Sequence, residues 1–273
     1  MAKANKLSKI ALTKEQGISR SSLYYQPKLE KKDWILKNQI EKTLKLNPSY
    51  GYRRIALALK VNHKRTFRVM KKYSIKPYRR RGRKWKKTKD NLRVYPNLLQ
   101  LMDFPTKDNL VWVLDFSVFS FHGKLIYLAT IMDIFNRKIV GWSLLNNHSV
   151  HLTLTALMNA LDKCGRPMVL HSDQGSEYKS KLYTDFARRL GIKLSMSNRA
   201  SPWENGYQES FYSQFKLDLG DINRCNSLGE LAVAIYQQIY YYNNHRIHTK
   251  LKMPPAVYAR KQTLLTNYMP IRV

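Results

Sequence analysis

The sequence has little cysteine, few acidic residues and no long apolar run. Its two cysteines, Cys164 and Cys225, are too few for a disulfide framework or a cysteine-rich zinc site. No stretch of about eighteen apolar residues is present, and the first residues contain no apolar segment of the signal-peptide type. We therefore expect a reduced, cytoplasmic protein without a membrane partner.

Basic residues outnumber acidic residues by a wide margin. The chain of 273 residues carries 49 Lys and Arg against 18 Asp and Glu, a formal net charge of +31. The excess is uneven, because residues 1–100 have a net charge of +24 and residues 101–273 only +7. Positive charge of this size repels itself unless a polyanion neutralises it, so nucleic acid is the expected partner. A hydrophobic content of 44% allows a packed core and excludes global disorder.

Short helices are expected in the N-terminal third, residues 1–76, which we interpret as a helical DNA-binding region. Apolar periodicity and the intervening breaks predict helices over 6–16, 19–25, 33–46, 51–60 and 63–73. The last two are separated by a short corner, and the second is basic, which is typical of a helix-turn-helix. We expect Lys64, Arg65 and Arg68 to contact DNA. A helical bundle with a solvated basic face is the alternative.

A basic linker is predicted over residues 77–105. Residues 78–89 are mostly Arg and Lys and have no apolar periodicity. Such a segment favours contact with phosphates along the DNA backbone. The residues expected to make these contacts are Arg79, Arg80, Arg81, Arg83 and Lys84.

An α/β domain is predicted over residues 106–262, followed by a C-terminal tail over 263–273. Apolar runs predict strands over 111–117, 125–134, 138–144, 168–171 and 192–196. Amphipathic segments predict helices over 149–163 and 179–190, then from near 203 to about 217, and over 227–245. Three strands followed by alternating helices and strands imply a mixed sheet with helices on both faces. This is the order of the ribonuclease-H-like fold.

Three carboxylates occupy positions that suit metal-dependent chemistry. Asp115 lies inside an apolar strand, Asp173 follows a short buried strand, and Glu209 lies in a helix. A carboxylate among apolar residues is costly unless it is paired or binds a cation, and Mg²⁺ prefers oxygen ligands. Two such ions can clamp the attacking and leaving oxygens of a phosphoryl transfer. We expect all three carboxylates to be catalytic and to bind metal, with Asp115 shared between the two ions.

Spacing adds to this prediction. Between Asp115 and Asp173 lie 57 residues, and between Asp173 and Glu209 lie 35. Lys216 follows Glu209 by two helical turns and therefore shares its face, where it could contact DNA.

Other polar residues in the domain have simpler interpretations. Asp133 is expected to be a turn residue and Glu177 a helix cap or a solvated side chain. Glu204 fits the third carboxylate position less well than Glu209. His171 is expected to make a local hydrogen bond. For Arg246 and His248, contact with DNA or the rim of the site and a structural role remain equally open.

The chain resembles the integrase-core transposases of bacterial insertion sequences, relatives of retroviral integrases with a D,D(35)E signature. The matching stretches are Val111–Asp115, Asp133–Trp142, His171–Tyr178, Ser201–Lys216 and Tyr242–His248. The resemblance spans roughly residues 45–262. It departs from the family pattern in a shorter turn between helices 51–60 and 63–73, and in Glu204, where Asp is usual.

The resemblance implies a specific activity. Such enzymes cut DNA at the ends of the element and join the exposed 3′-hydroxyls to target DNA by direct transesterification. It also implies two Mg²⁺ ions, which Mn²⁺ can replace, double-stranded DNA as the partner, and a homo-oligomer on that DNA. It further implies a partner protein or fusion from an upstream reading frame, and association with the bacterial nucleoid when bound to DNA. The alternatives are a DNA-binding protein without catalysis and a ribonuclease H.

Overall fold

The structure is a computed structural model that describes residues 17, 28–78, 95–197 and 206–268. The predicted helices over 6–16 and 19–25 therefore lie outside the described residues. The next three predicted helices are present as α2 (Lys28–Leu46), α3 (Tyr52–Leu59) and α4 (His63–Lys72). They enclose a small core of their own, made of Leu36, Ile40, Tyr50, Ile55, Val69 and Met70.

The corner between α3 and α4 is made by two capping residues. Lys60 ends α3 in the left-handed conformation, with φ of 54°. Asn62 then begins α4, because its side chain accepts a hydrogen bond of 2.8 Å from the backbone N–H of Lys64. The short corner thus separates α3 from α4 at the position that the sequence predicts.

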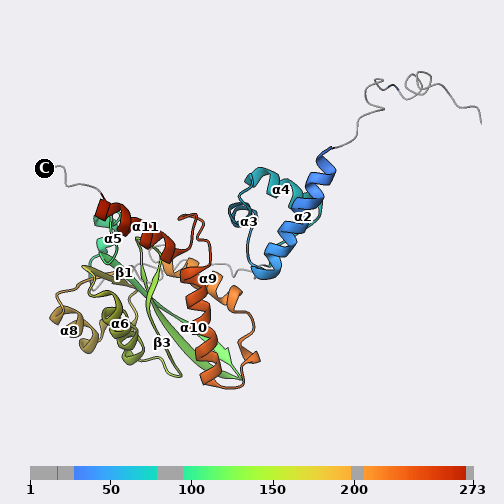
Figure 1. The fold of residues 1–273 in the computed structure, drawn as a ribbon. Coiled ribbons are helices and arrows are strands. Elements are labelled where there is room, and N and C mark those ends of the chain that lie inside the picture. Colours follow the sequence, from blue (N-terminus) through green and yellow to red (C-terminus); the bar gives the residue numbers. More distant parts are fainter. Residues whose placement is uncertain (1–16, 18–27, 79–94, 198–205, 269–273) are drawn as a thin grey trace, which may run out of the picture.

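A five-stranded mixed sheet forms the centre of the larger domain (Figure 1). Its strands are β1 (Val111–Phe121), β2 (Lys124–Asp133), β3 (Ile139–Leu145), β4 (Val169–Ser172) and β5 (Lys193–Met196). They lie in the order β3-β2-β1-β4-β5. The first three strands pair antiparallel, whereas β4 and β5 join β1 in parallel. This arrangement confirms the predicted ribonuclease-H-like sheet.

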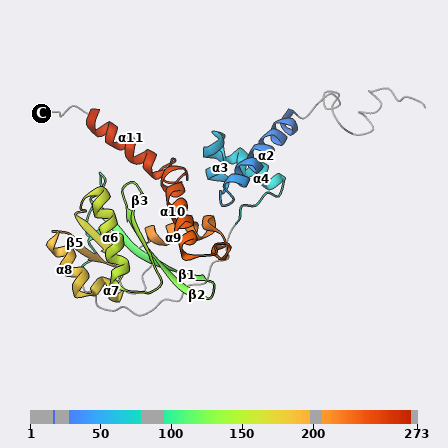
Figure 2. The ribbon, with the colours of Figure 1, turned by 60° about the horizontal axis from the view of Figure 1, so that its bottom comes forward.

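Helices cover both faces of the sheet (Figures 1 and 2). The covering helices are α6 (Val150–Cys164), α7 (Ser176–Lys179) and α8 (Lys181–Arg189) on one face, and α9 (Gly206–Leu219) and α10 (Leu228–Asn244) on the other. Successive side chains of β1 point to opposite faces of the sheet. Val111 and Val113 pack with α9 and α10, and Trp112 and Leu114 pack with α6 and α8. Two cores therefore sandwich the strand that carries Asp115.

Several short elements are not expected from the sequence. These are α5 (Leu98–Leu101), a 3₁₀ turn at Ile222–Arg224 and α11 (Pro255–Tyr268). Helix α11 crosses residue 262, so the predicted start of a C-terminal tail falls inside a helix. The predicted helix over 179–190 begins two residues late, at Lys181, because Ser180 separates α7 from α8 and caps the latter. None of the described helices is long and apolar enough to cross a membrane.

The helical region and the larger domain are joined by polar contacts beside α9 and α10 (Figure 2). The hydroxyl of Tyr241 donates a hydrogen bond to the side chain of Asn47. The backbone N–H of Ile247 donates to the hydroxyl of Tyr50 at 3.0 Å, and Nε of Arg54 donates to the carbonyl of Ile247 at 3.2 Å. The helical region therefore packs directly on the larger domain, through residues just before α3 and within it.

Candidate active site

Asp115 and Asp173 lie on neighbouring parallel strands. In the register of β1 and β4, Val111 is paired with Val169 and Val113 with His171. Two more residues in the same register bring Asp115 level with Asp173, which directly follows β4. The sequence separation of the two aspartates thus equals the offset between the strands. The pairing sets their carboxylates side by side at the C-terminal end of β4, next to the middle of β1.

Glu209 reaches this place because α9 is fixed across β1. The side-chain amide of Gln208 donates hydrogen bonds to the carbonyls of Val113 at 2.7 Å and Thr130 at 3.1 Å. One turn later, the hydroxyl of Tyr212 lies 3.0 Å from the carbonyl oxygen of Asp115. These buried side chains flank Glu209 in the helix. They hold the first turn of α9 over the strand, while Glu209 itself stays exposed.

The three carboxyl groups are electrostatically coupled. Asp115 keeps some exposed surface but is surrounded by protein on most sides, and burial followed by repulsion from Asp173 raises its pKa to about 8. Glu209 and Glu177 add smaller contributions in the same direction. Burial also raises the pKa of Asp173 and that of Glu209. Negative charges are therefore gathered here without enough positive charge to balance them, which is the environment that a cation would stabilise.

The carboxylate oxygens of these residues are suitable ligands for a hard divalent cation, although they do not surround a single point. Within the described residues, no three His, Cys, Asp or Glu side chains lie together as a ready metal site. Asp115 and Asp173 are each held by one backbone N–H, that of Phe116 at 2.8 Å and that of Gly175 at 2.9 Å. Each aspartate therefore retains carboxylate lone pairs for a metal ion, and Glu209 is the candidate to complete the set from the start of α9.

Glu177 is a fourth carboxylate beside this cluster, and our expectation that it faces solvent is wrong. Its side chain is buried, and Oε2 lies 3.3 Å from Nε2 of His148, in the loop before α6. The imidazole of His148 packs on Phe116, with ring centroids 4.4 Å apart. Gly175 makes this possible, because a Cβ there would lie 2.3 Å from Oε1 of Glu177.

Several of these contacts have no direct signal in the sequence. Gln208 and Tyr212 are uncharged residues of an amphipathic helix, and only the polar Thr130 within the apolar β2 hints that a polar partner is needed. Thr130 lies 3.0 Å from Oε1 of Gln208 and 2.9 Å from the hydroxyl of Tyr212. Likewise, the contact between Glu177 in α7 and His148 in the loop before α6 joins segments that lie far apart in the sequence.

Three other residues have local partners. Asp133 is buried at the end of β2 and accepts hydrogen bonds from the backbone N–H groups of Asn109 and Phe135, as expected for a turn residue. His171 is buried and pairs with Ser195 at 2.8 Å, also as expected. Nζ of Lys216 donates to the carbonyl of Val118 at 3.1 Å, so this lysine is held against β1.

The basic residues of the helical region differ from one another. Arg68 donates two hydrogen bonds to the carboxylate of Asp33, at 2.6 and 2.8 Å, so it has a structural partner. Arg65 donates to the carbonyl of Lys32 at 3.2 Å, and Lys64 is exposed at the start of α4. Five predicted DNA contacts lie outside the described residues: Arg79, Arg80, Arg81, Arg83 and Lys84.

Comparison with known families identifies the domain. Residues 105–202 match the family described as integrase core domain, and residues 190–255 match a second family of the same description. The InsK protein of insertion sequence element IS150 from Escherichia coli (strain K12) is 32% identical over 270 residues, which are 95% of this chain and 94% of that protein. The transposase of insertion sequence element IS904 from Lactococcus lactis subsp. lactis (strain IL1403) is 32% identical over 186 residues, 66% of this chain and 69% of that protein.

A solved structure shows the same fold. It is the intasome of simian T-cell lymphotropic virus in complex with PP2A regulatory subunit B56 gamma. One of its chains matches 86% of this chain and 76% of its own length, with a TM-score of 0.50 and 16% sequence identity. At this identity the likeness supports the fold and its helical N-terminal extension, and the site is argued from the residues of this chain.

Proposed function

The chain belongs to the insertion-sequence transposases with an integrase core domain, and we propose that Asp115, Asp173 and Glu209 are the carboxylates that bind its catalytic metal ions. A transposase of this type is a polynucleotidyl transferase. In this proposal the enzyme cleaves DNA at the ends of the element and joins each 3′-hydroxyl to target DNA. The observation that carries it is the strand register that sets Asp115 beside Asp173, below the helix of Glu209.

The chemistry is phosphoryl transfer assisted by two divalent cations, Mg²⁺ with Mn²⁺ as a substitute. When bound, such ions activate the attacking oxygen and stabilise the leaving oxygen. Asp115 would contact both ions, and Asp173 and Glu209 would each hold one. Gln208 and Tyr212 keep α9 in place on β1, so they position Glu209 and touch no reacting atom.

The partners proposed for this chain follow from the same assignment. The basic residues of α4, the linker and Lys216 would bind duplex DNA, both element end and target. The division into a helical region (1–76), a linker (77–105), a catalytic core (106–262) and a tail remains our proposal. Because two ends must be cut and joined, we expect a homo-oligomer on DNA, with a partner protein or fusion from an upstream reading frame.

The test is strand transfer with purified protein, labelled element ends and Mg²⁺. The substitutions Asp115→Asn, Asp173→Asn and Glu209→Gln should each lower the rate by at least about 10²–10³-fold, the scale seen when a group acting on the transition state is removed. Asp185→Asn, at an exposed position, and Glu204→Gln are the controls and should retain activity. Full activity in any of the three site variants would refute its assignment.

DNA binding must be measured in parallel with this assay. Each site variant should bind the element end at least as tightly as the wild type, because the lost carboxylate repels phosphate. A wild-type protein that binds ends without metal-dependent cleavage would favour the non-catalytic alternative.

A further inference from the structure

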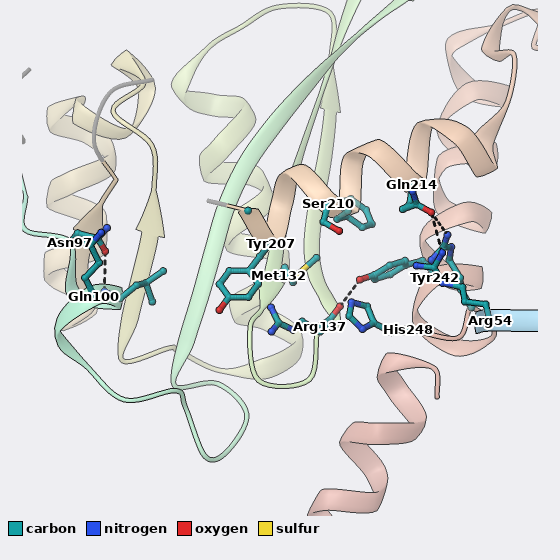
Figure 3. Close-up of a pocket in the computed structure, with 14 residues that line it drawn as sticks. Arg54, Asn97, Gln100, Met132, Arg137, Tyr207, Ser210, Gln214, Tyr242 and His248 are labelled. Atoms are coloured by element: carbon teal, nitrogen blue, oxygen red, sulfur yellow. Dashed lines mark hydrogen bonds between the residues drawn. The ribbon is translucent and has the colours of Figure 1, made fainter. Parts of the chain in front are cut away.

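A second polar site lies on the other side of α9. Three arginines line a cavity of about 500 Å³: Arg54 from α3, Arg137 from the turn between β2 and β3, and Arg246 after α10 (Figure 3). Tyr207 and Gln214 line it from α9. At 100° per residue these two side chains project well away from the direction of Glu209, so the cavity is separate from the carboxylate cluster.

The charge of this cavity, which we call the arginine pocket, is poorly balanced. No carboxylate is among its described lining residues. Arg246 is paired with Asp218, whose Oδ2 lies 2.5 Å from its Nε, and it also donates to Oε1 of Gln214 at 2.9 Å. Among the described residues, Arg54 donates only to neutral oxygens, those of Ile247 and Gln214. Among the described residues, only one of the three guanidinium groups is thus paired with a carboxylate.

Arg137 is the third guanidinium, and it has no ion-pair partner in the described part of the chain. Its side chain is 4% exposed, and its Nε is buried without a hydrogen-bond acceptor among the described residues. Cζ lies 4.0 Å from the centre of the Tyr207 ring. In Figure 3 the side chain lies between Tyr207 and His248 and points into the cavity. A buried guanidinium in this situation requires an anion or a strong acceptor.

The pKa of His248 reflects the burial and the positive charge of this pocket. Burial, followed by the charges of Arg137, Arg54 and Arg246, lowers the pKa of His248 to about 4. Burial is the larger cause, and the arginine charges add to it, so both favour the neutral imidazole of His248. A bound anion would offset the arginine charges and make the protonated imidazole less unfavourable.

We propose that the arginine pocket binds a phosphate group. Guanidinium groups recognise phosphate oxygens through paired N–H donors, and Arg137 still has a buried donor to offer. The phosphate is either free inorganic phosphate or a phosphodiester of bound DNA, and the second source rests on the proposed function. Because Arg54 belongs to the helical region and Arg137 to the core, the bound group would connect the two.

The experiment follows the imidazole of His248 by NMR in the full-length, metal-free protein. The histidine signal is assigned with His248→Gln and titrated with pH in chloride, in inorganic phosphate at equal ionic strength, and with duplex DNA. We expect the His248 pKa to rise in the presence of the source that occupies the pocket. A rise in phosphate identifies the free anion, and a rise only with DNA identifies the phosphodiester.

Variants then locate the binding site. Arg54→Gln and Arg137→Gln should weaken the effect at least about tenfold in ligand concentration, as expected when a charge-assisted hydrogen bond is lost. Their sequence neighbours provide matched controls, Arg53→Gln and Lys138→Gln, which should retain the wild-type response. Arg137→Lys keeps a buried positive charge and replaces Arg137→Gln if that variant does not fold.

Two results would overturn the proposal. The first is a His248 pKa that is the same in chloride, phosphate and DNA. The second is a rise that persists undiminished in both Arg54 and Arg137 variants. Asp115→Asn should leave the response intact, so failure here is distinguishable from failure of the proposed catalytic assignment.

Discussion

Helix α9 separates two clusters of like charge that are balanced to different degrees. On one side, Asp115, Asp173 and Glu209 repel one another, and burial leaves the pKa of Asp115 at about 8. On the other side, Arg246 has a buried partner in Asp218, although Arg137 has none among the described residues. The acidic cluster is therefore a source of strain in the metal-free protein, whereas the Arg246–Asp218 pair supports the fold. Removing a charge should have opposite effects on the two sides.

The largest expected effect is the loss of Arg246. Arg246→Ala leaves Asp218 buried without its partner, and breaking a buried pair costs about 3–5 kcal/mol of unfolding free energy. The side chains of the pair are only 2% and 9% exposed. Urea denaturation at neutral pH should show this loss.

A surface ion pair provides the control. The side chains of Arg188 and Asp185 are 63% and 39% exposed. Arg188→Ala should therefore cost no more than about 1 kcal/mol. Equal losses in the two variants would show that the Arg246 pair does not support the fold in the way described.

On the acidic side, a substitution should stabilise the protein. The pKa of Asp115 is about 8 in the folded protein, which is above its value in the unfolded chain. The folded state therefore holds this proton more tightly than the unfolded state does. The resulting contribution to stability is complete below about pH 4 and is lost as the pH rises towards 8. Asp115→Asn cannot ionise. Relative to this variant, the metal-free wild type should lose about 1.4 kcal/mol per pH unit between pH 5 and 7.

The measurement is urea denaturation of both proteins in a chelator at several pH values. Groups away from the acidic cluster titrate equally in the two proteins, so their contributions cancel in the difference. Mg²⁺ should reduce the wild-type slope, because the ion stabilises the ionised carboxylate. Parallel stability curves in the chelator would contradict the raised pKa.

Of the two clusters beside α9, the acidic one is the easier to locate from the sequence. A charged residue inside the apolar run of β1 is conspicuous, and the positions of Asp173 and Glu209 follow from the order of strands and helices. Both the apolar run around Asp115 and the order of the elements can be read from neighbouring residues or from the spacing of apolar residues. The five strands were located within a few residues for the same reason, since an apolar sheet buried on both faces leaves continuous apolar runs.

The supporting contacts could not be predicted, because they join distant segments. Arg54, Arg137 and Arg246 come from a helix, a turn and a loop, and nothing in their local sequence indicates a shared cavity. Glu177 follows a glycine and a serine, which favoured a solvated position, but its partner His148 precedes it by a helix and a strand. Helix α11 was missed because its apolar periodicity is weak.

Glu177 allows a finer test of the acidic cluster. Glu177→Gln removes one negative charge near the proposed metal ions and the anchor of His148. Partners of this kind around metal ligands typically change metal affinity by about 10–100-fold. We expect the Mg²⁺ concentration for half-maximal strand transfer to rise about tenfold, with a smaller change in the maximal rate.

Ser176→Ala is the matched control for Glu177. It removes only the hydroxyl that lies 3.3 Å from the same carboxylate and leaves the charge in place. Its Mg²⁺ requirement should stay close to that of the wild type. An unchanged requirement in Glu177→Gln would limit this residue to holding the loop.

The smallest expected effect separates DNA contact from structural support within α4. Lys64 is exposed, whereas Arg68 is bonded to Asp33 and lowers the pKa of that carboxyl. Lys64→Gln should reduce the slope of log affinity against log salt by about one, because one phosphate contact releases one counterion, and should leave the melting temperature unchanged. Arg68→Gln should lower the melting temperature, because Asp33 loses both its hydrogen bonds. If Arg68→Gln instead changes only the salt slope, then the arginine exchanges Asp33 for phosphate on DNA, and the basic face of α4 is a DNA contact throughout.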